Sequence, residues 1–304
     1  MVGLEEKKTN KLFLTLVAPL LFVLLWSSGA IVVKLGLHDS TPFGYVAIRF
    51  FLSTAIMWSI CILIKSPIPR KLAQWRYIIL TGLLLQAGYQ IFFFLSLDFD
   101  ISPGVLSIIL GAQPILTAIS SKNKTSVYQW TGLLLGISGL TFVVGSSLFV
   151  GKFTIAGIGY AILSLACITV GTLMQKRITV SMPTNMAIQY TGGAAALLIL
   201  TPLVEKTTIS WTFTFWFALL WMTLVISIGA SMLLFYMIQK GNLTKVTSLF
   251  YCVPPLTALL DYFIYGHKLS IASIVGMGII IVGLILVNKQ GLIKTKVEPE
   301  GKAV

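Results

Sequence analysis

Apolar residues occur along this chain in long runs, and short polar segments separate the runs. A helix needs roughly 20 apolar residues to cross a bilayer core of about 30 Å, and it satisfies its own backbone amides, which hydrocarbon cannot do. Reading the runs against the polar breaks predicts ten membrane-spanning helices, called spans 1 to 10 below. They cover residues 12–33, 43–64, 77–97, 104–121, 128–149, 154–174, 185–204, 212–238, 246–264 and 271–288.

The composition favours the same class of protein. Hydrophobic residues make up 57% of the chain and charged residues 10%, with a mean hydropathy of +0.94, whereas a soluble domain needs a charged surface. The formal charge of +13 would also suit a nucleic-acid binder, but the basic residues lie in short segments between apolar runs, so no nucleic-acid partner is expected. The cysteines all fall inside apolar runs, so we expect neither a metal site nor a cofactor.

The basic residues also predict the orientation of the spans. With the N-terminus inside, the cytoplasmic segments hold 17 Lys and Arg residues and the outer segments hold 4, Lys34 among them. Such an excess marks the cytoplasmic side. We therefore predict a multi-pass protein of the cell inner (cytoplasmic) membrane with both termini in the cytoplasm. Span 1 is too long for a signal-peptide core and is expected to be retained.

The two halves of the chain repeat one another. Ordered matches recur at an offset of 140 to 144 residues: Gly29 with Gly171, Ala47 with Ala187, Gly88 with Gly229, Pro114 with Pro255, and Gly132 with Gly276. Because each half has an odd number of spans, the second copy must insert upside down relative to the first. Inverted repeats of this kind place a binding site near the membrane midplane, between two halves that can rock.

The expected fold is therefore an all-α membrane protein of ten transmembrane helices, arranged as two inverted five-helix repeats. Residues 12–149 form the first repeat and residues 150–288 the second. A cytoplasmic segment, 1–11, precedes them, and a basic cytoplasmic tail, 289–304, follows them.

Several motifs resemble the EamA-like family of the drug/metabolite transporter superfamily. They are the Leu25-Trp-Ser-Ser-Gly29 segment, Pro42 followed by Arg49-Phe50, and the prolines Pro114 and Pro255, each followed by a glycine-rich helix. The likeness covers residues 12–288. It implies a ten-helix bundle with a central cavity that moves amino acids, nucleosides, amines or other small metabolites.

The chain departs from the resemblance at the ends of spans 4 and 9. Similar proteins often carry Gly-Glu and a basic residue there, whereas this chain has Ser120-Ser-Lys-Asn-Lys124 and Tyr265-Gly-His-Lys268. Both glutamates are missing, which argues against proton coupling through them.

Polar residues inside the spans are candidates for the substrate site. Arg49 is a charge well inside span 2, where it attracts an anionic group of the substrate or, alternatively, reaches the outer surface or backbone carbonyls. Gln86 and Gln90 lie four residues apart in span 3, with Tyr89 beside them, and either line the cavity or join helices by hydrogen bonds. Trp26 in span 1 can stack on a partly apolar solute.

Prolines mark further candidates in spans 4 and 9. Gln113-Pro114 and Pro254-Pro255 are expected to break or kink these helices at matching places, and Tyr251 lies one turn before the second break. Asp261 and His267 are candidates for ion coupling. Alternatively, Asp261 is a residue of a helix interface and His267 is a solvated loop residue.

These features favour a secondary transporter that exports an amino acid or a related small metabolite by alternating access. A metabolite importer or exchanger, for a nucleoside or an adenosylated compound such as S-adenosylmethionine, is the alternative. An enzyme is disfavoured because no paired catalytic groups lie within the spans. The protein is expected to be surrounded by membrane lipid. The sequence is compatible with coupling to a proton gradient or to a counter-substrate gradient, and with a monomer or a homodimer.

Overall fold

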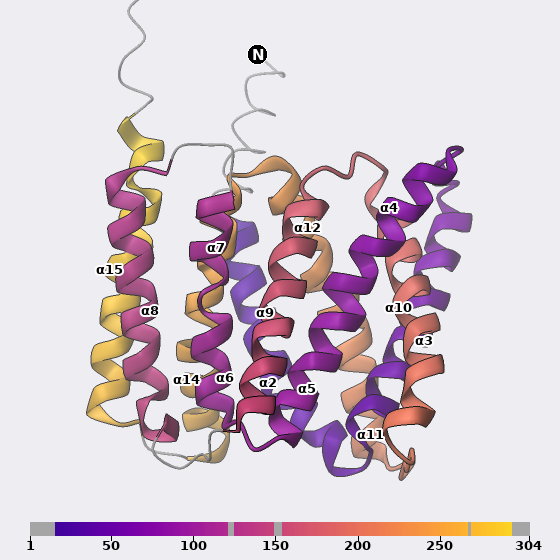
Figure 1. Cartoon of the computed structure of the whole chain (residues 1–304), viewed down its shortest axis with the longest axis horizontal. Coiled ribbons are helices and arrows are strands. Elements are labelled where there is room, and N and C mark those ends of the chain that lie inside the picture. Colours follow the sequence, from indigo (N-terminus) through magenta and orange to yellow (C-terminus); the bar gives the residue numbers. More distant parts are fainter. Residues whose placement is uncertain (1–15, 121–124, 149–153, 267–268, 294–304) are drawn as a thin grey trace, which may run out of the picture.

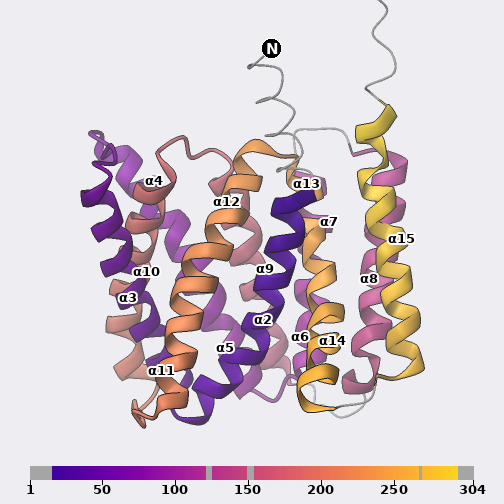
Figure 2. The same ribbon diagram turned by 180° about the vertical axis from the view of Figure 1, so that it is seen from behind.

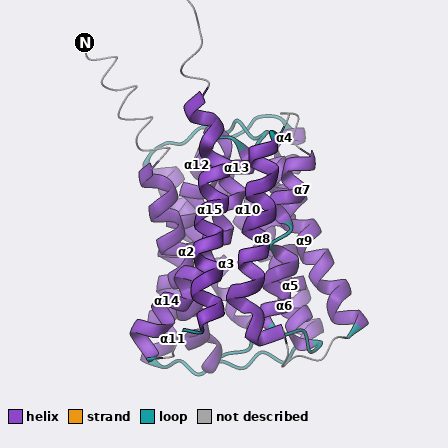
Figure 3. Ribbon diagram, turned by 90° about the vertical axis from the view of Figure 1, so that its left-hand side faces the viewer, coloured by secondary structure: helices purple, strands orange, loops and turns teal. Residues whose placement is uncertain are grey.

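The chain folds into a bundle of long, roughly parallel helices (Figure 1). The computed structural model describes residues 16–120, 125–148, 154–266 and 269–293. Within these ranges Figure 3 shows helices joined by loops and no strand. Ten helical segments there are long and apolar enough to cross a membrane, so the predicted all-helical membrane fold is confirmed.

The helices follow the predicted spans in order. Span 1 is α2 (Ala18–His38), span 2 is α3 (Pro42–Leu63), span 3 is α4 (Leu72–Gly82), η2 (Leu83–Gly88) and α5 (Tyr89–Asp98), span 4 is α6 (Pro103–Leu110) and α7 (Gln113–Ser120), and span 5 is α8 (Val127–Leu148). Span 6 is α9 (Ile155–Gln175), span 7 is α10 (Met182–Val204), span 8 is α11 (Phe213–Leu220), η3 (Trp221–Ala230) and α12 (Ser231–Lys240), span 9 is α13 (Leu243–Ser248), η4 (Leu249–Cys252) and α14 (Val253–Tyr265), and span 10 is α15 (Ile271–Ile293).

Three predicted helix boundaries were wrong. Span 3 was expected to begin at residue 77, but α4 begins at Leu72. Span 1 was expected to end at residue 33, but α2 continues to His38 and includes Lys34, which is exposed on the helix rather than in a loop. Span 10 was expected to end at residue 288, but α15 continues to Ile293. Hydropathy marks only the apolar part of a helix, while the backbone hydrogen bonds continue through polar residues as long as nothing interrupts them.

A closely packed pair of helices lies at each end of the bundle. α8 packs along α15 at one end, and α3 packs along α10 at the other, as Figures 1 and 2 show from opposite sides. The α8–α15 contact is made by glycines. A Cβ atom at Gly132 would lie 2.4 Å from the carbonyl oxygen of Gly283, and one at Gly276 would lie 2.5 Å from that of Gly139. The two backbones touch because these positions lack side chains.

Four of the described spans depart from regular α-helix near their middles. Spans 3 and 8 contain π-helical turns, η2 and η3, and span 9 contains the 3₁₀ turn η4. Span 4 is interrupted at Gly111–Ala112, between α6 and α7. Such irregular turns are frequent at functional sites because they re-aim side chains and free backbone groups.

The broken spans 4 and 9 meet through threonines. The hydroxyls of Thr117 on α7 and Thr247 on α13 lie 3.0 Å apart, and Thr117 also donates to the carbonyl of Gln113 at 2.6 Å. These bonds satisfy buried polar groups near the helix break.

Hydrogen bonds join two connecting loops on one side of the bundle. Thr41 donates its backbone N–H to the carbonyl of Thr208 at 3.1 Å, and Ser210 donates to the carbonyl of Asp39 at 2.7 Å. The Asp39 carboxylate accepts from the hydroxyl of Thr212 and lies 3.0 Å from the ring of His38. We call residues 39–41 and 208–212 the loop clasp.

Candidate functional site

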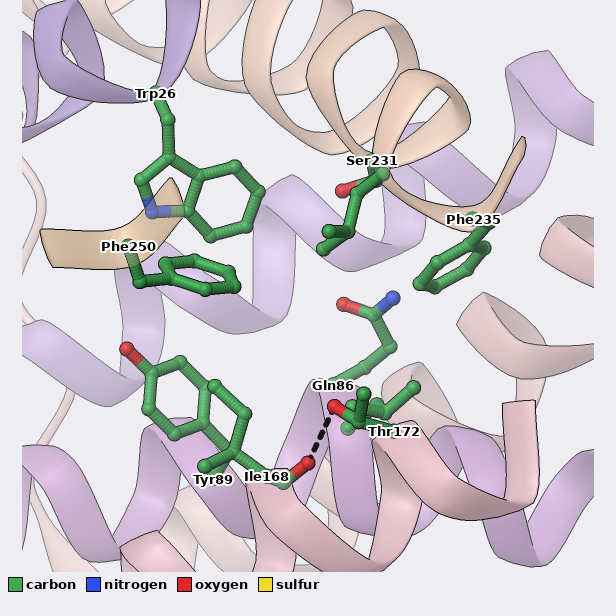
Figure 4. Close-up of a pocket in the computed structure, with 10 residues that line it drawn as sticks. Trp26, Gln86, Tyr89, Ile168, Thr172, Ser231, Phe235 and Phe250 are labelled. Atoms are coloured by element: carbon green, nitrogen blue, oxygen red, sulfur yellow. Dashed lines mark hydrogen bonds between the residues drawn. The ribbon is translucent and has the colours of Figure 1, made fainter. Parts of the chain in front are cut away.

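A cavity lies at the centre of the bundle, where both halves of the chain meet. Its volume is about 30 Å³, which is enough for water but too small for an organic solute. Its lining residues are Trp26 from α2, Leu85 and Gln86 from η2, Tyr89 from α5, Ile168 and Thr172 from α9, Ser231, Leu234 and Phe235 from α12, and Phe250 from η4 (Figure 4).

Aromatic rings form one wall of the cavity. Trp26 and Phe250 meet edge to face, with ring centroids 5.6 Å apart and planes at 86°. Phe22 supports both rings from behind, at 5.3 Å from Trp26 and 5.4 Å from Phe250. In Figure 4 the ring of Tyr89 lies on the same side of the cavity as this pair. We call Trp26, Tyr89 and Phe250 the aromatic wall; it suits the apolar or aromatic part of a solute.

A few polar groups also face the cavity. Figure 4 shows the Gln86 amide reaching into it, and this amide has no hydrogen bond to any described residue. Thr172 is already engaged, because its hydroxyl donates to the carbonyl of Ile168 at 2.6 Å and accepts from Gln113 Nε2 at 3.2 Å. Ser231 donates to the carbonyl of Ile226 at 3.2 Å. Gln86 therefore offers both an amide donor and an acceptor to a ligand.

No charged side chain of the described chain lines the cavity. An apolar cavity with a few convergent polar groups is typical of small-molecule sites.

The π-helical turn η2 separates the predicted cluster of span 3. Gln86 lies in η2 and Tyr89 follows it, and both line the cavity. Gln90 instead turns to α3, where its Oε1 accepts from Arg49 Nη2 at 2.6 Å. The spacing of four residues had placed Gln86 and Gln90 on one face, which holds for a regular α-helix but not beside a π turn.

Arg49 is buried next to the cavity without lining it. Its side chain is 5% exposed, so it does not reach the surface, and its guanidinium lies 5.2 Å from the centroid of the Phe50 ring. Its Nε is buried and has no hydrogen-bond partner among the described residues. Its hydrogen-bond partner Gln90 directly follows Tyr89, which lines the cavity.

The remaining predicted residues lie around the cavity or away from it. Pro114 lies in the first turn of α7 and is buried, while Pro254 and Pro255 lie in the first turn of α14, after the break at η4. Tyr251 is buried among residues of α8 and α15, with its ring against Gly136, so it does not line the cavity.

One of the two predicted coupling residues can be placed relative to the cavity. Asp261 lies on α14, outside the set of lining residues, and His267 lies outside the described residues.

Several lining residues were not predicted from the sequence. Thr172, Ser231 and Phe250 are ordinary residues in apolar runs and carry no local signal. A weak signal existed in the matched glycines Gly88 and Gly229, because both fall in the π-helical turns beside the cavity.

Comparison with known proteins places the chain in a family. The EamA-like transporter family matches it twice, over residues 13–145 and 155–289. The chain is 25% identical to an uncharacterized transporter of Synechocystis, over 95% of this chain and 94% of that protein. It is 24% identical to a chloroplastic WAT1-related protein of Arabidopsis thaliana, over 90% and 68%. It is 23% identical to the uncharacterized inner membrane transporter YedA of Escherichia coli, over 87% of each chain.

A solved crystal structure shares the fold. It superposes with a TM-score of 0.77, covers 92% of this chain and 98% of its own, and is 19% identical in sequence. The ten apolar helices, the central cavity and a family match across both halves lead to one conclusion: this chain is a multi-pass membrane protein that belongs to the EamA-like transporter family.

Proposed function

We propose that this protein is a secondary transporter that moves a small organic metabolite, an amino acid or a related compound, across the cell inner membrane by alternating access, in the export direction. The observation that carries the proposal is the central cavity. Its walls come from spans 1 and 3 of the first half and spans 6, 8 and 9 of the second. A movement of one half against the other would therefore open or close it.

The glycine contacts of α8 and α15 support an inverted repeat. The sequence matches Gly132 with Gly276 and Gly139 with Gly283. If each residue is exchanged for its match, the contact of Gly132 with Gly283 becomes the contact of Gly276 with Gly139, and both contacts are present. A two-fold axis in the membrane plane predicts such a reciprocal pair of contacts. Two halves related by this axis could rock against each other during transport.

The small cavity volume implies that the halves must move. An organic solute needs a few hundred Å³, whereas the space wide enough for water is about 30 Å³. We assign this conformation to a closed state in the cycle. The paired π-helical turns η2 and η3 lie beside the cavity and are the elements that we expect to change as it opens.

The alternative is an importer or exchanger of a nucleoside or an adenosylated compound. Its aromatic base would stack on the aromatic wall, which is the observation that favours it. No described acid lines the cavity, and the family's glutamates are missing, so we favour exchange against a counter-substrate over proton coupling.

Flux in proteoliposomes tests the proposal. Purified protein is reconstituted and radiolabelled amino acids, nucleosides and S-adenosylmethionine are offered, with and without an unlabelled counter-substrate inside. We expect saturable flux of at least one class that exceeds protein-free vesicles. Folded protein that moves no solute of the panel would refute a transport function. Faster efflux than uptake at equal gradients, in vesicles of known orientation, supports export.

Variants of the cavity sharpen this experiment. Gln86→Leu removes the free amide and should raise the half-saturation concentration by about 2- to 10-fold, since a lost hydrogen bond costs about 0.5–1.5 kcal/mol. Gln74→Leu removes an exposed amide on α4; it is the matched control and should leave the half-saturation concentration unchanged. Equal half-saturation concentrations in both variants would show that Gln86 does not bind the solute.

A further inference from the structure

Arg49 carries a buried charge that pairs with no carboxylate of the described residues. It lies two turns into α3, in an apolar span, and is 5% exposed. Within the described residues the structure gives it no ion pair with a carboxylate. A charge at membrane depth is costly, and such residues normally pair with one another or mark a substrate pathway.

The guanidinium is held in place but only partly satisfied. Of its five N–H donors, one from Nη2 goes to Gln90 Oε1 at 2.6 Å, and Nε is buried with no partner among the described residues. Phe50 lies beneath it at 5.2 Å. An amide oxygen can orient a guanidinium but brings no negative charge, so the positive charge is positioned and left uncompensated.

Neighbouring residues of α5 contact Arg49 and line the cavity. Gln90 accepts a hydrogen bond from Arg49, and Tyr89, directly before it in the chain, lines the cavity. Gln86 lines the cavity too, and the backbone of Gly193 lies against both Gln86 and the Phe50 ring, which packs on the guanidinium. α5 thus contacts Arg49 through Gln90 and the cavity through Tyr89.

We infer that Arg49 recognises a carboxylate on the transported metabolite, whose apolar part lies against the aromatic wall. The inference rests on the proposed transport function and names its substrate class. The planar guanidinium fork matches the two oxygens of a carboxylate, and one positive charge is balanced by a monoanion. As the cavity opens, Tyr89 moves aside and the carboxylate joins or replaces Gln90 on the guanidinium.

Matched pairs of ligands test the charge requirement on the unmodified protein. Aromatic and aliphatic amino acids and monocarboxylates are each offered beside their uncharged amides, and binding is measured by thermal shift and calorimetry in detergent. We expect the carboxylate of the tightest-binding pair to bind about 10- to 100-fold more tightly than its amide, because a charged hydrogen bond is lost. Equal binding of the two would overturn the inference.

Variants locate the charge at Arg49. Arg49→Gln should lower the affinity for the carboxylate ligand by about 10- to 100-fold and leave the affinity for its amide unchanged. A merely structural defect would lower both affinities. Gln90→Glu supplies a carboxylate within the protein that pairs with Arg49. It should likewise lower the affinity for the carboxylate ligand and should raise the thermal stability of the protein. Lys34→Gln, which removes an exposed charge on α2, is the matched control and should change neither affinity.

The outcomes separate this inference from the proposed function. Flux of carboxylates that is equal in Arg49→Gln and the unmodified protein would overturn the inference and leave transport intact. A protein that moves only uncharged solutes would do the same. If Arg49→Gln does not fold, Gln90→Glu and the ligand pairs decide the question. A protein that binds and moves no solute at all contradicts both proposals.

Discussion

The contact between α8 and α15 gives a sharp prediction about stability. Replacing Gly132 with alanine would place a Cβ atom 2.4 Å from the carbonyl oxygen of Gly283 and 2.8 Å from Cγ2 of Val287. Ordinary contacts begin at 3.4 Å, so the two helices must separate by about 1 Å at this point. The obstacle is backbone, which cannot rotate away as a side chain can.

The expected cost follows from overpacking. Extra methyl groups in a close-packed contact typically cost about 1–3 kcal/mol, whereas alanine gains up to about 1 kcal/mol over glycine in helix propensity. We therefore expect Gly132→Ala to lower the free energy of unfolding by about 1–2 kcal/mol. Gly276→Ala should behave alike, since its Cβ would lie 2.5 Å from the carbonyl oxygen of Gly139.

Equilibrium unfolding in mixed micelles of mild detergent and SDS, followed by circular dichroism, measures the change. Gly278→Ala is the matched control for Gly276→Ala on α15, because a Cβ there meets nothing within 4 Å and should be neutral or stabilising. A Gly132→Ala protein as stable as the unmodified chain would refute the backbone contact. Equal losses in Gly132→Ala and Gly278→Ala would show a general intolerance of alanine instead.

Two further predictions concern buried and loop groups. The Tyr251 hydroxyl is buried and has no hydrogen-bond partner among the described residues, so Tyr251→Phe should raise the free energy of unfolding by up to about 1–2 kcal/mol; a loss in the same unfolding assay would contradict this. In the loop clasp, the Thr212 hydroxyl and, secondarily, His38 hold the pKa of Asp39 below its usual value, so the folded protein favours the ionised form. The clasp should therefore stabilise the folded protein above the ordinary aspartate pKa, and this stabilisation should be lost as the pH falls through the lowered pKa of Asp39. Thr212→Val removes the main hydrogen bond to Asp39 and should reduce this loss in acid unfolding titrations. An unchanged titration would contradict the prediction.

The predicted site was only partly assembled in space. Trp26, Gln86 and Tyr89 do line the cavity, and Gln113 reaches it through Thr172. Tyr251 lies in the 3₁₀ turn η4 and packs against α8 and α15 instead of the cavity. Its neighbour Phe250 lines the cavity. Adjacent residues on a helix face different directions, and no local pattern in an all-apolar run says which faces inward.

The number and order of the membrane spans could be predicted from the hydropathy pattern, because the bilayer thickness fixes how long an apolar helix must be. It also marked the glycines that let helices touch and the prolines beside the breaks in spans 4 and 9. These are local properties of the chain.

Which residues meet at the centre depends on the packing of the helices. Beside the π-helical turn η2, Gln86 faces the cavity while Gln90 binds Arg49, and α9, α12 and η4 supply walls of the cavity from residues far away in sequence. Contacts between distant segments depend on how ten apolar surfaces pack together, and many packings are compatible with one hydropathy pattern. The charge on Arg49 was visible in the sequence, but the lack of any described acid beside it was decided by the fold.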